Sequence, residues 1–436
     1  MRNNHHVAHD AAQEGDGVFN VMAHERPRRQ RLLVGCVLVS LLGACRPDTT
    51  AQAGPDDLFY VLQPENVSVA ELAGAGFHWL ILEPSRDGSA ASEFSAAEIE
   101  QIRSAGPCPK TVLAYLSIGE AEDYRDYWDP NWVDANGDPI PGVAPAWLGP
   151  IDPDWPGNYK VRYWDPDWQA ILFGTPTGPD KTPLDRIIDE GFDGVYLDII
   201  DAYEFWGPEG DGNELDRMTA RAYMIDLVEA IAHYARVTRG VADFLVFPQN
   251  ASDIIRDDDY EFDADTVRYF AAISGIGQED LYYNELSPQP SEETAYTLEQ
   301  LREFAARGKT VLVTDYVVNA GNPSAGANDA RVSDFYTRCR AEGFVPYAAL
   351  SDRDLDEIVT FSGSGWTYAQ PAPGCPDCTG DLNGDAVVDL GDLSILLANY
   401  NAGSGMEYED GDLDGDGDVD LSDLSAMLAV YGDTCT

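Results

Sequence analysis

Two aspartates follow a short apolar run near the middle of the chain. The segment is Gly-Phe-Asp-Gly-Val-Tyr-Leu-Asp-Ile-Ile-Asp-Ala-Tyr, residues 191 to 203, in which the apolar run opens onto Asp198 and then Asp201. Asp is disfavoured in strands and costly to bury without a partner, so strand stability does not explain these residues. At the C-terminal end of a barrel strand, by contrast, a carboxylate is in the usual position of a catalytic acid. The segment therefore predicts an enzyme.

Polar residues end a whole series of such runs over residues 57–365, and helical patterns separate the runs. Strand and helix units that alternate in this way predict a (β/α)8 TIM barrel. A doubly wound sheet is the alternative, but no Gly-rich nucleotide turn follows the first run. The runs are Phe59–Leu62, Trp79–Leu82, Val112–Leu116, Val195–Leu197, Phe244–Phe247, Phe270–Ile273, Val311–Val313 and Val345–Leu350. The residues that follow them are Gln63, Glu83, Glu120, Asp198, Asn250, Glu279, Asp315 and Asp352.

A long loop after the third run is rich in aromatic residues. It extends from Glu120 to about Tyr163, and Trp164 follows directly. Long ordered loops are often functional, and aromatic faces stack on sugar rings. The alternative is that the loop folds over a small core of its own, which would use some of these side chains.

The charge of the chain limits its partners. The 436 residues carry 27 Lys and Arg against 77 Asp and Glu, a formal net charge of -50. Such a chain repels phosphate backbones, so no nucleic-acid partner is expected. The charge suits calcium or a cationic substrate, and simple solubility is the bland alternative.

Residues 1–56 read as a leader. Four arginines between Arg26 and Arg31 precede the short apolar stretch Leu32–Ala44, as in an export signal, and Met22 is a candidate for the true start. Leu42-Gly-Ala-Cys45 resembles a lipobox, which implies a lipid anchor at Cys45; cleavage after Ala53 is the alternative. We expect an exported protein, either an outer-membrane lipoprotein or extracellular.

A linker at residues 366–379 leads to a repeat of 31 residues within a small all-α module at 380–436. In each copy, oxygen-bearing side chains stand at positions 1, 3, 5 and 12 of a loop, the spacing of a calcium loop. Two such Ca²⁺ sites are therefore expected. Their ligands are Asp381, Asn383, Asp385 and Asp392 in the first copy and Asp412, Asp414, Asp416 and Asp423 in the second.

The paired loops resemble a type I dockerin, which implies a cohesin partner. Two features depart from the dockerin pattern. Ala386 replaces the turn glycine that the second loop keeps as Gly417, and Leu390-Gly391 and Leu421-Ser422 are not the usual Ser-Thr pair.

Three segments of the barrel resemble glycoside hydrolase family 114, the endo-α-1,4-polygalactosaminidases and their relatives. They are Tyr115–Trp128, the segment at 191 to 203, and Gly275–Tyr283. The resemblance implies a TIM barrel without a catalytic cofactor, and a catalytic pair of Asp198 at the fourth strand end and Glu279 at the sixth. Two carboxyls are what glycoside hydrolysis requires. Our hypothesis makes Asp198 the nucleophile or base and Glu279 the acid, with Glu120 as the main rival.

Nine further residues are expected to contact substrate, and the chain is expected to act as a monomer on a polysaccharide. Asp201 would tune or position Asp198. A neutral α-linked polysaccharide is an alternative substrate, and a surface lipoprotein that binds glycan without cleaving it is an alternative function. The substrate-contact candidates are Glu83, Tyr115, Glu120, Arg125, Tyr163, Trp164, Asp201, Asn250 and Asp315.

Overall fold

The computed structural model describes most of the chain after the leader. The described residues are 58–358 without 76, 106–108, 179–180 and 324–325, then 362–363 and 366–367, and finally 380–432 without 384–386, 404–405, 407 and 414–417. The predicted leader with Met22 and Cys45, and the linker from 368 to 379, lie outside them. None of the helices in these ranges is long and apolar enough to cross a membrane.

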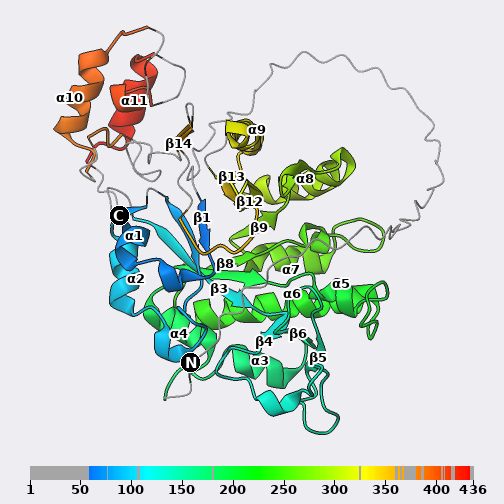
Figure 1. Ribbon diagram of the computed structural model, residues 1–436. Helices are drawn as coiled ribbons and strands as arrows, with labels where there is room; N and C mark the ends of the chain where they lie inside the picture. Colours follow the sequence, from blue (N-terminus) through cyan, green and yellow to red (C-terminus); the bar gives the residue numbers. More distant parts are fainter. Residues whose placement is uncertain are drawn as a thin grey trace, which may run out of the picture. The chain divides into compact units, whose positions relative to one another are not determined.

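Eight parallel strands form the frame of the larger domain within the described residues (Figure 1). Five pair in the order β1-β2-β3-β7-β8 and three in the order β9-β12-β13. The amide of Asn250 bonds Gly277 O at 2.8 Å, which joins β8 to β9, and Leu62 and Gln63 beyond β1 bond Leu355 O beyond β13. The strands are β1 Leu58–Val61, β2 Trp79–Leu82, β3 Thr111–Ser117, β7 Gly194–Asp198, β8 Leu245–Pro248, β9 Gly275–Glu279, β12 Thr310–Val318 and β13 Val345–Leu350.

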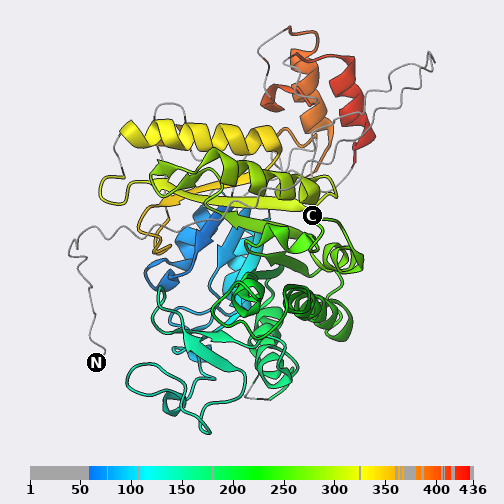
Figure 2. The ribbon, with the colours of Figure 1, turned by 90° about the vertical axis from the view of Figure 1, so that its right-hand side faces the viewer.

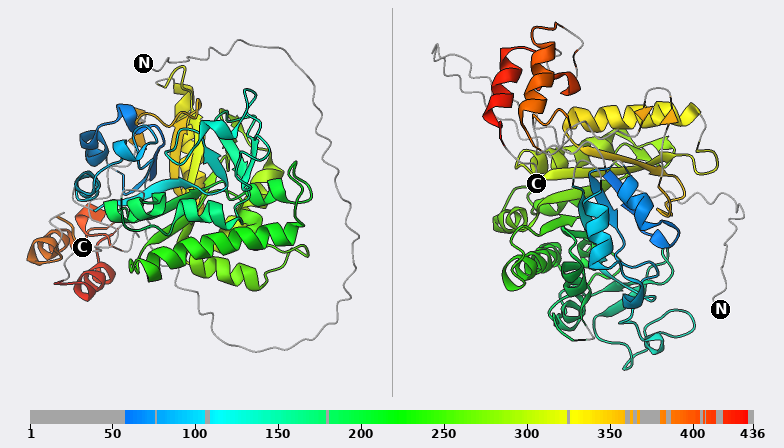
Figure 3. Two further views of the ribbon diagram at one scale, coloured as in Figure 1. Left: turned by 90° about the horizontal axis from the view of Figure 1, so that it is seen from below. Right: turned by 90° about the vertical axis from the view of Figure 1, so that its left-hand side faces the viewer.

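Helices connect these strands and lie outside them, as the views in Figures 2 and 3 show. Local sequence sets their ends: Asp216 caps the start of α6, and Gly191, with a φ of 81°, ends α4 just before β7. This architecture agrees with the predicted α/β barrel. The helices are α1 Val69–Gly74, α2 Ala96–Arg103, α3 Pro166–Leu172, α4 Pro183–Glu190, α5 Ala202–Trp206, α6 Arg217–His233, α7 Ala264–Ala272, α8 Ser291–Ala305 and α9 Gly326–Glu342.

The prediction for the sixth strand was wrong in position. Phe270–Ile273 covers the end of helix α7, and the strand is the glycine-rich β9 that follows it. A search for apolar runs misses β9 because neighbouring strands fill the space of its missing side chains. A Cβ on Gly277 would lie 1.8 Å from the Tyr196 hydroxyl, and one on Gly275 2.1 Å from the Phe247 ring.

The long aromatic loop contains a small antiparallel sheet in the order β4-β6-β5 (β4 Glu120–Glu122, β5 Leu148–Ile151, β6 Asn158–Val161). Its aromatic rings largely pack on one another: Trp132 contacts Trp128 and Trp147, and Trp147 contacts Trp168. Tyr124 and Trp155 are the exposed rings among them, at 45% and 58%. The alternative of a core built within the loop therefore accounts for most of its aromatics.

The C-terminal module has two capped helices, α10 (Leu390–Asn399) and α11 (Leu421–Ala429). The side chains of Asp389 and Asp420 cap their first turns in matching capping boxes. A small apolar core lies beneath them: Leu382, Val388, Leu396, Val419 and Met427. The short strands β10 Tyr283–Asn284, β11 Ser287–Pro288, β14 Ser362–Gly363 and β15 Trp366–Thr367 complete the described strands.

Candidate active site

Asp198 is the last residue of β7 and is tightly held. Its Oδ2 accepts a hydrogen bond from the Tyr115 hydroxyl at 2.6 Å, and its Oδ1 accepts one from the Ile199 amide at 2.8 Å. Ile199 has a φ of 62°, a left-handed conformation that is strained for a β-branched residue. The strained turn directs the chain away from the strand immediately after the carboxylate, which stays half-buried and accessible.

Glu279 is the last residue of β9 and has three side-chain donors. Gln249 Nε2 and Asn250 Nδ2 donate to its Oε2 at 2.6 and 3.3 Å, and the Tyr316 hydroxyl donates to its Oε1. Asn250 also accepts the Glu279 amide at 2.9 Å. The carboxylate is thus fixed by residues from β12 and from the end of β8, and it too is half-buried.

The two carboxyls influence each other's charge. The pKa of Asp198 is raised to about 8, chiefly by burial; the negative charges of Glu279 and Asp201 contribute to the rise, and the hydrogen bonds from Tyr115 and the Ile199 amide oppose it. Burial also raises the pKa of Glu279, with Asp280 as an additional cause. Both charges also contribute, after burial, to the raised pKa of Tyr196, which lies on β7 two residues before Asp198. Asp198 and Glu279 therefore belong to one electrostatic unit.

The donor pattern bears on which carboxyl holds a proton. Hydrogen bonds to an anion favour ionisation, and Glu279 accepts three from side chains whereas Asp198 accepts one. By this count Glu279 is the favoured anion, whereas the sequence-based hypothesis gives the anionic role to Asp198. A bound cationic sugar would favour ionisation of whichever carboxyl it approaches, so the order of roles in the complex stays a prediction.

Glu83 and Arg125, both expected to contact substrate, contact each other. Arg125 donates to the two Glu83 oxygens at 2.7 and 2.8 Å, and its Nε lies 2.7 Å from Glu122. The guanidinium is satisfied by two buried carboxylates, an arrangement that leaves few free hydrogen-bonding groups. These contacts give both residues a structural role in place of the expected contact.

Glu120, the rival for catalysis, is fully buried in the β4-β6-β5 sheet. It forms an ion pair with Lys160, which also contacts Asp152 at 2.7 Å, and Asn158 donates to it at 3.2 Å. Burial raises the pKa of Glu120 to about 7. Because its oxygens are enclosed and paired, Glu120 is not placed to receive a substrate.

Three further substrate-contact candidates are engaged in the structure. Asp315 is fully buried and accepts the amides of Leu281, Tyr282 and Tyr283 at 2.8 to 2.9 Å. Tyr163 is also fully buried, and its hydroxyl donates to Ala220 O. Trp164 packs edge-on against Tyr163 and Trp206. The first two are corrected to structural residues because no part of them reaches solvent, and Trp164 is largely used in packing.

Tyr115, Asn250 and Asp201 each act on one carboxyl of the predicted pair. Tyr115 bonds Asp198, Asn250 bonds Glu279, and the charge of Asp201 adds to the raised pKa of Asp198. Sequence reasoning missed Gln249 and Tyr316, which also bond Glu279. Each is adjacent in sequence to a residue chosen as a strand end, so a wider window at every strand end would have included both.

A pocket of about 480 Å³ has Tyr115 in its lining, but neither Asp198 nor Glu279 lines it. The charged residues in its lining include the carboxylate of Glu122 and three cations, Arg125, Lys181 and Arg186. Each of the three cations already has a carboxylate partner. The space is of the size of a small ligand or sugar unit.

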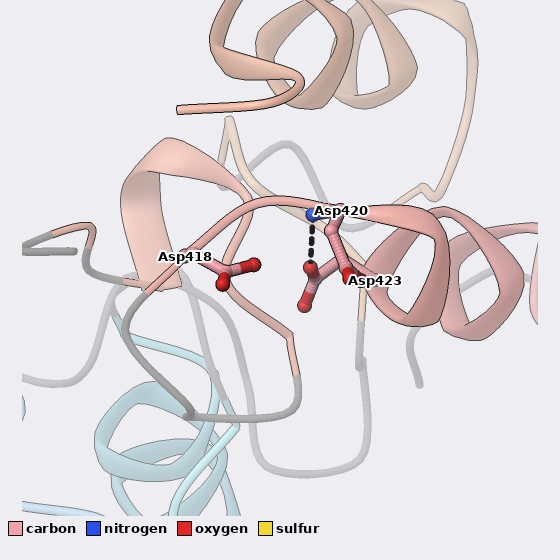
Figure 4. Close-up of side chains that lie close together, drawn as sticks. All are labelled: Asp418, Asp420 and Asp423. Carbon is pink, nitrogen blue, oxygen red and sulfur yellow. Dashed lines mark hydrogen bonds between the residues drawn. The ribbon is translucent and has the colours of Figure 1, made fainter. Parts of the chain in front are cut away.

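The second predicted calcium loop shows a group of three carboxylates. Single oxygens of Asp418, Asp420 and Asp423 lie within 4.8 Å of one another at the start of α11 (Figure 4). Asp423 and its counterpart Asp392 are fully buried, and each accepts backbone amides from the start of its own loop. Oxygen-only donors fit calcium, although the capping box already explains part of the arrangement. Asp385, Asp414 and Asp416 lie outside the described residues.

A (β/α)8 barrel whose strand ends carry two coupled carboxyls is the arrangement of a glycoside hydrolase. The chain matches the model of glycoside hydrolase family GH114 over residues 85–366, and it belongs to this family. An uncharacterised protein of Thermotoga maritima is 38% identical over 308 residues, 71% of this chain and 84% of its own length. The uncharacterised protein MJ1477 of Methanocaldococcus jannaschii is 36% identical over 302 residues, 69% of this chain and 78% of its own length.

Two glycoside hydrolase domains are among the solved structures with a similar course of the chain. That of PelA from Pseudomonas aeruginosa has a TM-score of 0.48 at 18% identity, and the match covers 70% of this chain and 98% of that domain. That of PgaB (BpsB) from Bordetella bronchiseptica has a TM-score of 0.39 at 11% identity, and the match covers 69% of this chain and 95% of that domain.

Proposed function

We propose that the protein is an exported, endo-acting glycosidase that cleaves an α-1,4-linked galactosamine-type polysaccharide through Asp198 and Glu279. The observation that carries the proposal is the pair itself: two accessible carboxyls at the ends of β7 and β9, coupled in charge, in a GH114 chain. One carboxyl of such a pair protonates the leaving oxygen while the other attacks the sugar or activates water.

Charge supports a cationic substrate. The chain carries -50 overall, and the exposed Asp201 follows Asp198 by three residues. A negative charge at this place would attract an amino sugar and reject an anionic one.

The direct test is cleavage of three matched polymers: de-N-acetylated α-1,4-galactosamine, its N-acetylated form, and a neutral α-linked galactan. The proposal expects new reducing ends and medium-length products from the first. Cleavage of the galactan alone would replace the substrate but keep the enzyme. Binding of all three without product would instead support a glycan-binding barrel.

The order of roles can be tested by azide rescue. In Asp198→Ala and Glu279→Ala variants, azide can enter the space of the missing carboxylate. If Asp198 is the nucleophile of a retaining enzyme, its variant should form a glycosyl azide inverted at the anomeric carbon. If Glu279 is the nucleophile, the product of inverted configuration should come from the Glu279 variant.

For the C-terminal module, we propose calcium-dependent docking to a cohesin-type protein. The matching positions Leu390 and Leu421 are 66% and 64% exposed, and Leu397 and Leu428 are 51% and 57% exposed. Large apolar side chains that remain in water at equivalent places on both helices indicate a binding surface. A cohesin pull-down in calcium, repeated in chelator, tests this proposal; retention in chelator would contradict it.

Export with a lipid anchor at Cys45 remains a proposal of the same kind. Metabolic labelling with palmitate should mark the full-length protein, and Cys45→Ser should abolish the label. A label that persists in this variant would rule out Cys45 as the anchor.

A further inference from the structure

Arg353 lies just after β13 and reaches across the site toward Glu279. Its Nη2 lies 2.7 and 2.6 Å from the two Asp280 oxygens, and its guanidinium carbon is 4.1 Å from the centre of the Tyr316 ring. The hydroxyl of that ring donates to Glu279. Arg353 is thus connected to the catalytic carboxyl through one intervening side chain.

The backbone is strained at Arg353 and at its ion-pair partner Asp280. Arg353 has a φ of 63° and Asp280 a φ of 52°, so both partners of the ion pair adopt the left-handed conformation that side chains rarely take. Strain of this kind persists where the surrounding structure holds it, and it often marks a functional site. A surface ion pair would not need it.

The groups that surround Glu279 are otherwise neutral or acidic. Tyr60 comes from β1, Tyr196 and Asp198 from β7, Gln249 and Asn250 from the end of β8, and Tyr316 from β12; Asp280 follows Glu279 directly. Arg353, from the loop after β13, supplies a positive charge that lowers the pKa of Glu279 and so favours its charged form.

We propose that Arg353 is a positioning residue that holds the Tyr316 ring so that its hydroxyl donates to Glu279 and keeps this carboxyl ionised more readily. The guanidinium lies over the ring, and its ion pair with Asp280 fixes it there. The cation also makes the phenol a stronger donor, because it favours negative charge on the ring oxygen. The inference rests on the proposed function for its role in catalysis, but its effect on Glu279 exists without substrate.

The test is therefore a titration of Glu279 in the free, full-length protein. The infrared carboxyl band that disappears in Glu279→Gln identifies the group, and its pH dependence gives the pKa. In Arg353→Met we expect this pKa to rise by about one unit, because the variant loses both the cation and the aligned hydroxyl. Arg353→Lys, which keeps the charge without the planar group, should lie between. An unchanged or lowered pKa in Arg353→Met would overturn the proposal.

A double variant separates action through Tyr316 from a general charge effect. Tyr316→Phe removes the hydroxyl and should itself raise the Glu279 pKa. In Tyr316→Phe, adding Arg353→Met should then raise the pKa by clearly less than it does in the natural protein, since only the direct effect of the charges of Arg353 and Asp280 remains. A full further shift in the double variant would show that Arg353 acts through space and would refute the positioning role.

Two controls keep the result clear. Arg302→Met removes another arginine with a carboxylate partner, Glu342, from an exposed position, and should leave the titration unchanged. Thermal unfolding of Arg353→Met shows whether the variant is folded.

Where hydrolysis is measurable, the limb of the pH–rate profile that reports Glu279 should move to higher pH together with the titration, and kcat should fall more than KM rises. A shifted titration in a protein that cleaves no polymer would leave the positioning role standing and refute the proposed function alone.

Discussion

The carboxyl of Asp198 binds its proton more tightly than the carboxyl of an aspartate in water does. Burial is the main cause, and the charge of Glu279 adds to it. Two hydrogen-bond donors, the Tyr115 hydroxyl and the Ile199 amide, stabilise the ionised form of this carboxyl. Such a group can exchange a proton near neutral pH, which ordinary aspartates do not do.

Conservative replacement of either carboxyl of the proposed catalytic pair should remove most of the turnover while the fold persists. Asp198→Asn and Glu279→Gln are each expected to lower kcat/KM on the order of 10³-fold, because they remove proton transfer or nucleophilic attack. Initial rates of reducing-end release measure the effect. Glu120→Gln is the matched comparison and should lose much less activity; a loss as large as that of the pair would restore Glu120 as the rival.

The raised pKa of Asp198 also predicts a pH-dependent stability. The folded protein keeps this proton up to about pH 8, whereas the unfolded chain releases it near pH 3.8, the ordinary pKa of an aspartate. Folding therefore binds a proton between these values, and the contribution of Asp198 to stability falls as pH rises through that window. Asp198→Asn cannot ionise and avoids this loss. Its melting temperature relative to the natural protein should thus increase from pH 4 to pH 8, as scanning calorimetry can show.

Among the elements, the segment after β9 depends on one buried carboxylate. Asp315 in β12 accepts three consecutive amides of this segment, which begins with Glu279 and Asp280. Asp315 therefore couples the position of Glu279, the proposed catalytic residue, to the neighbouring strand β12.

Asp315→Ala should be strongly destabilising because it leaves buried amides without partners. A loss on the order of 3 kcal/mol or more in the free energy of unfolding is expected from the cost of unsatisfied groups. Asp315→Asn retains one acceptor oxygen and should lose less. Urea unfolding gives both values. Equal stability of the alanine variant and the natural protein would contradict the anchoring role.

Strand ends could be predicted from sequence, whereas the use of each side chain could not. Apolar runs located seven of the eight barrel strands, and the strand-end rule found Asp198. Glu279 was also among the strand-end residues, but the run assigned to it, Phe270–Ile273, covers the end of helix α7, and the glycines of β9 hide its true strand. Its assignment to the catalytic pair depended on the family motif. The rule failed for Glu83 and Asp315 because a polar residue at a strand end can turn toward a buried partner, and those partners, Arg125 and the amides after Glu279, become visible only in the folded structure.

In the molecule as a whole, two parts have separate apolar cores. The barrel core extends over the parallel strands, and the part of the C-terminal module that the structure describes has a core of five buried side chains. Such a small core is weak support by itself, so a module of this kind often depends on bound metal.

Calcium should therefore act on the module and leave catalysis unaffected. In the full-length protein, chelator is expected to increase proteolysis after residue 380 without changing kcat/KM. Isothermal titration with Ca²⁺ should detect binding that Asp392→Ala and Asp423→Ala each reduce. Binding that survives the double variant, or hydrolysis that fails in chelator, would contradict this separation.

The glycines of β9 have a consequence for how related sequences can differ. The Tyr196 hydroxyl lies within 1.8 Å of where a Cβ on Gly277 would be, so the two positions share one volume. A relative with a larger residue at position 277 should carry a smaller one at position 196, and intermediates with both large residues should be rare. The two positions are expected to vary together across an alignment, although 81 residues separate them in the chain.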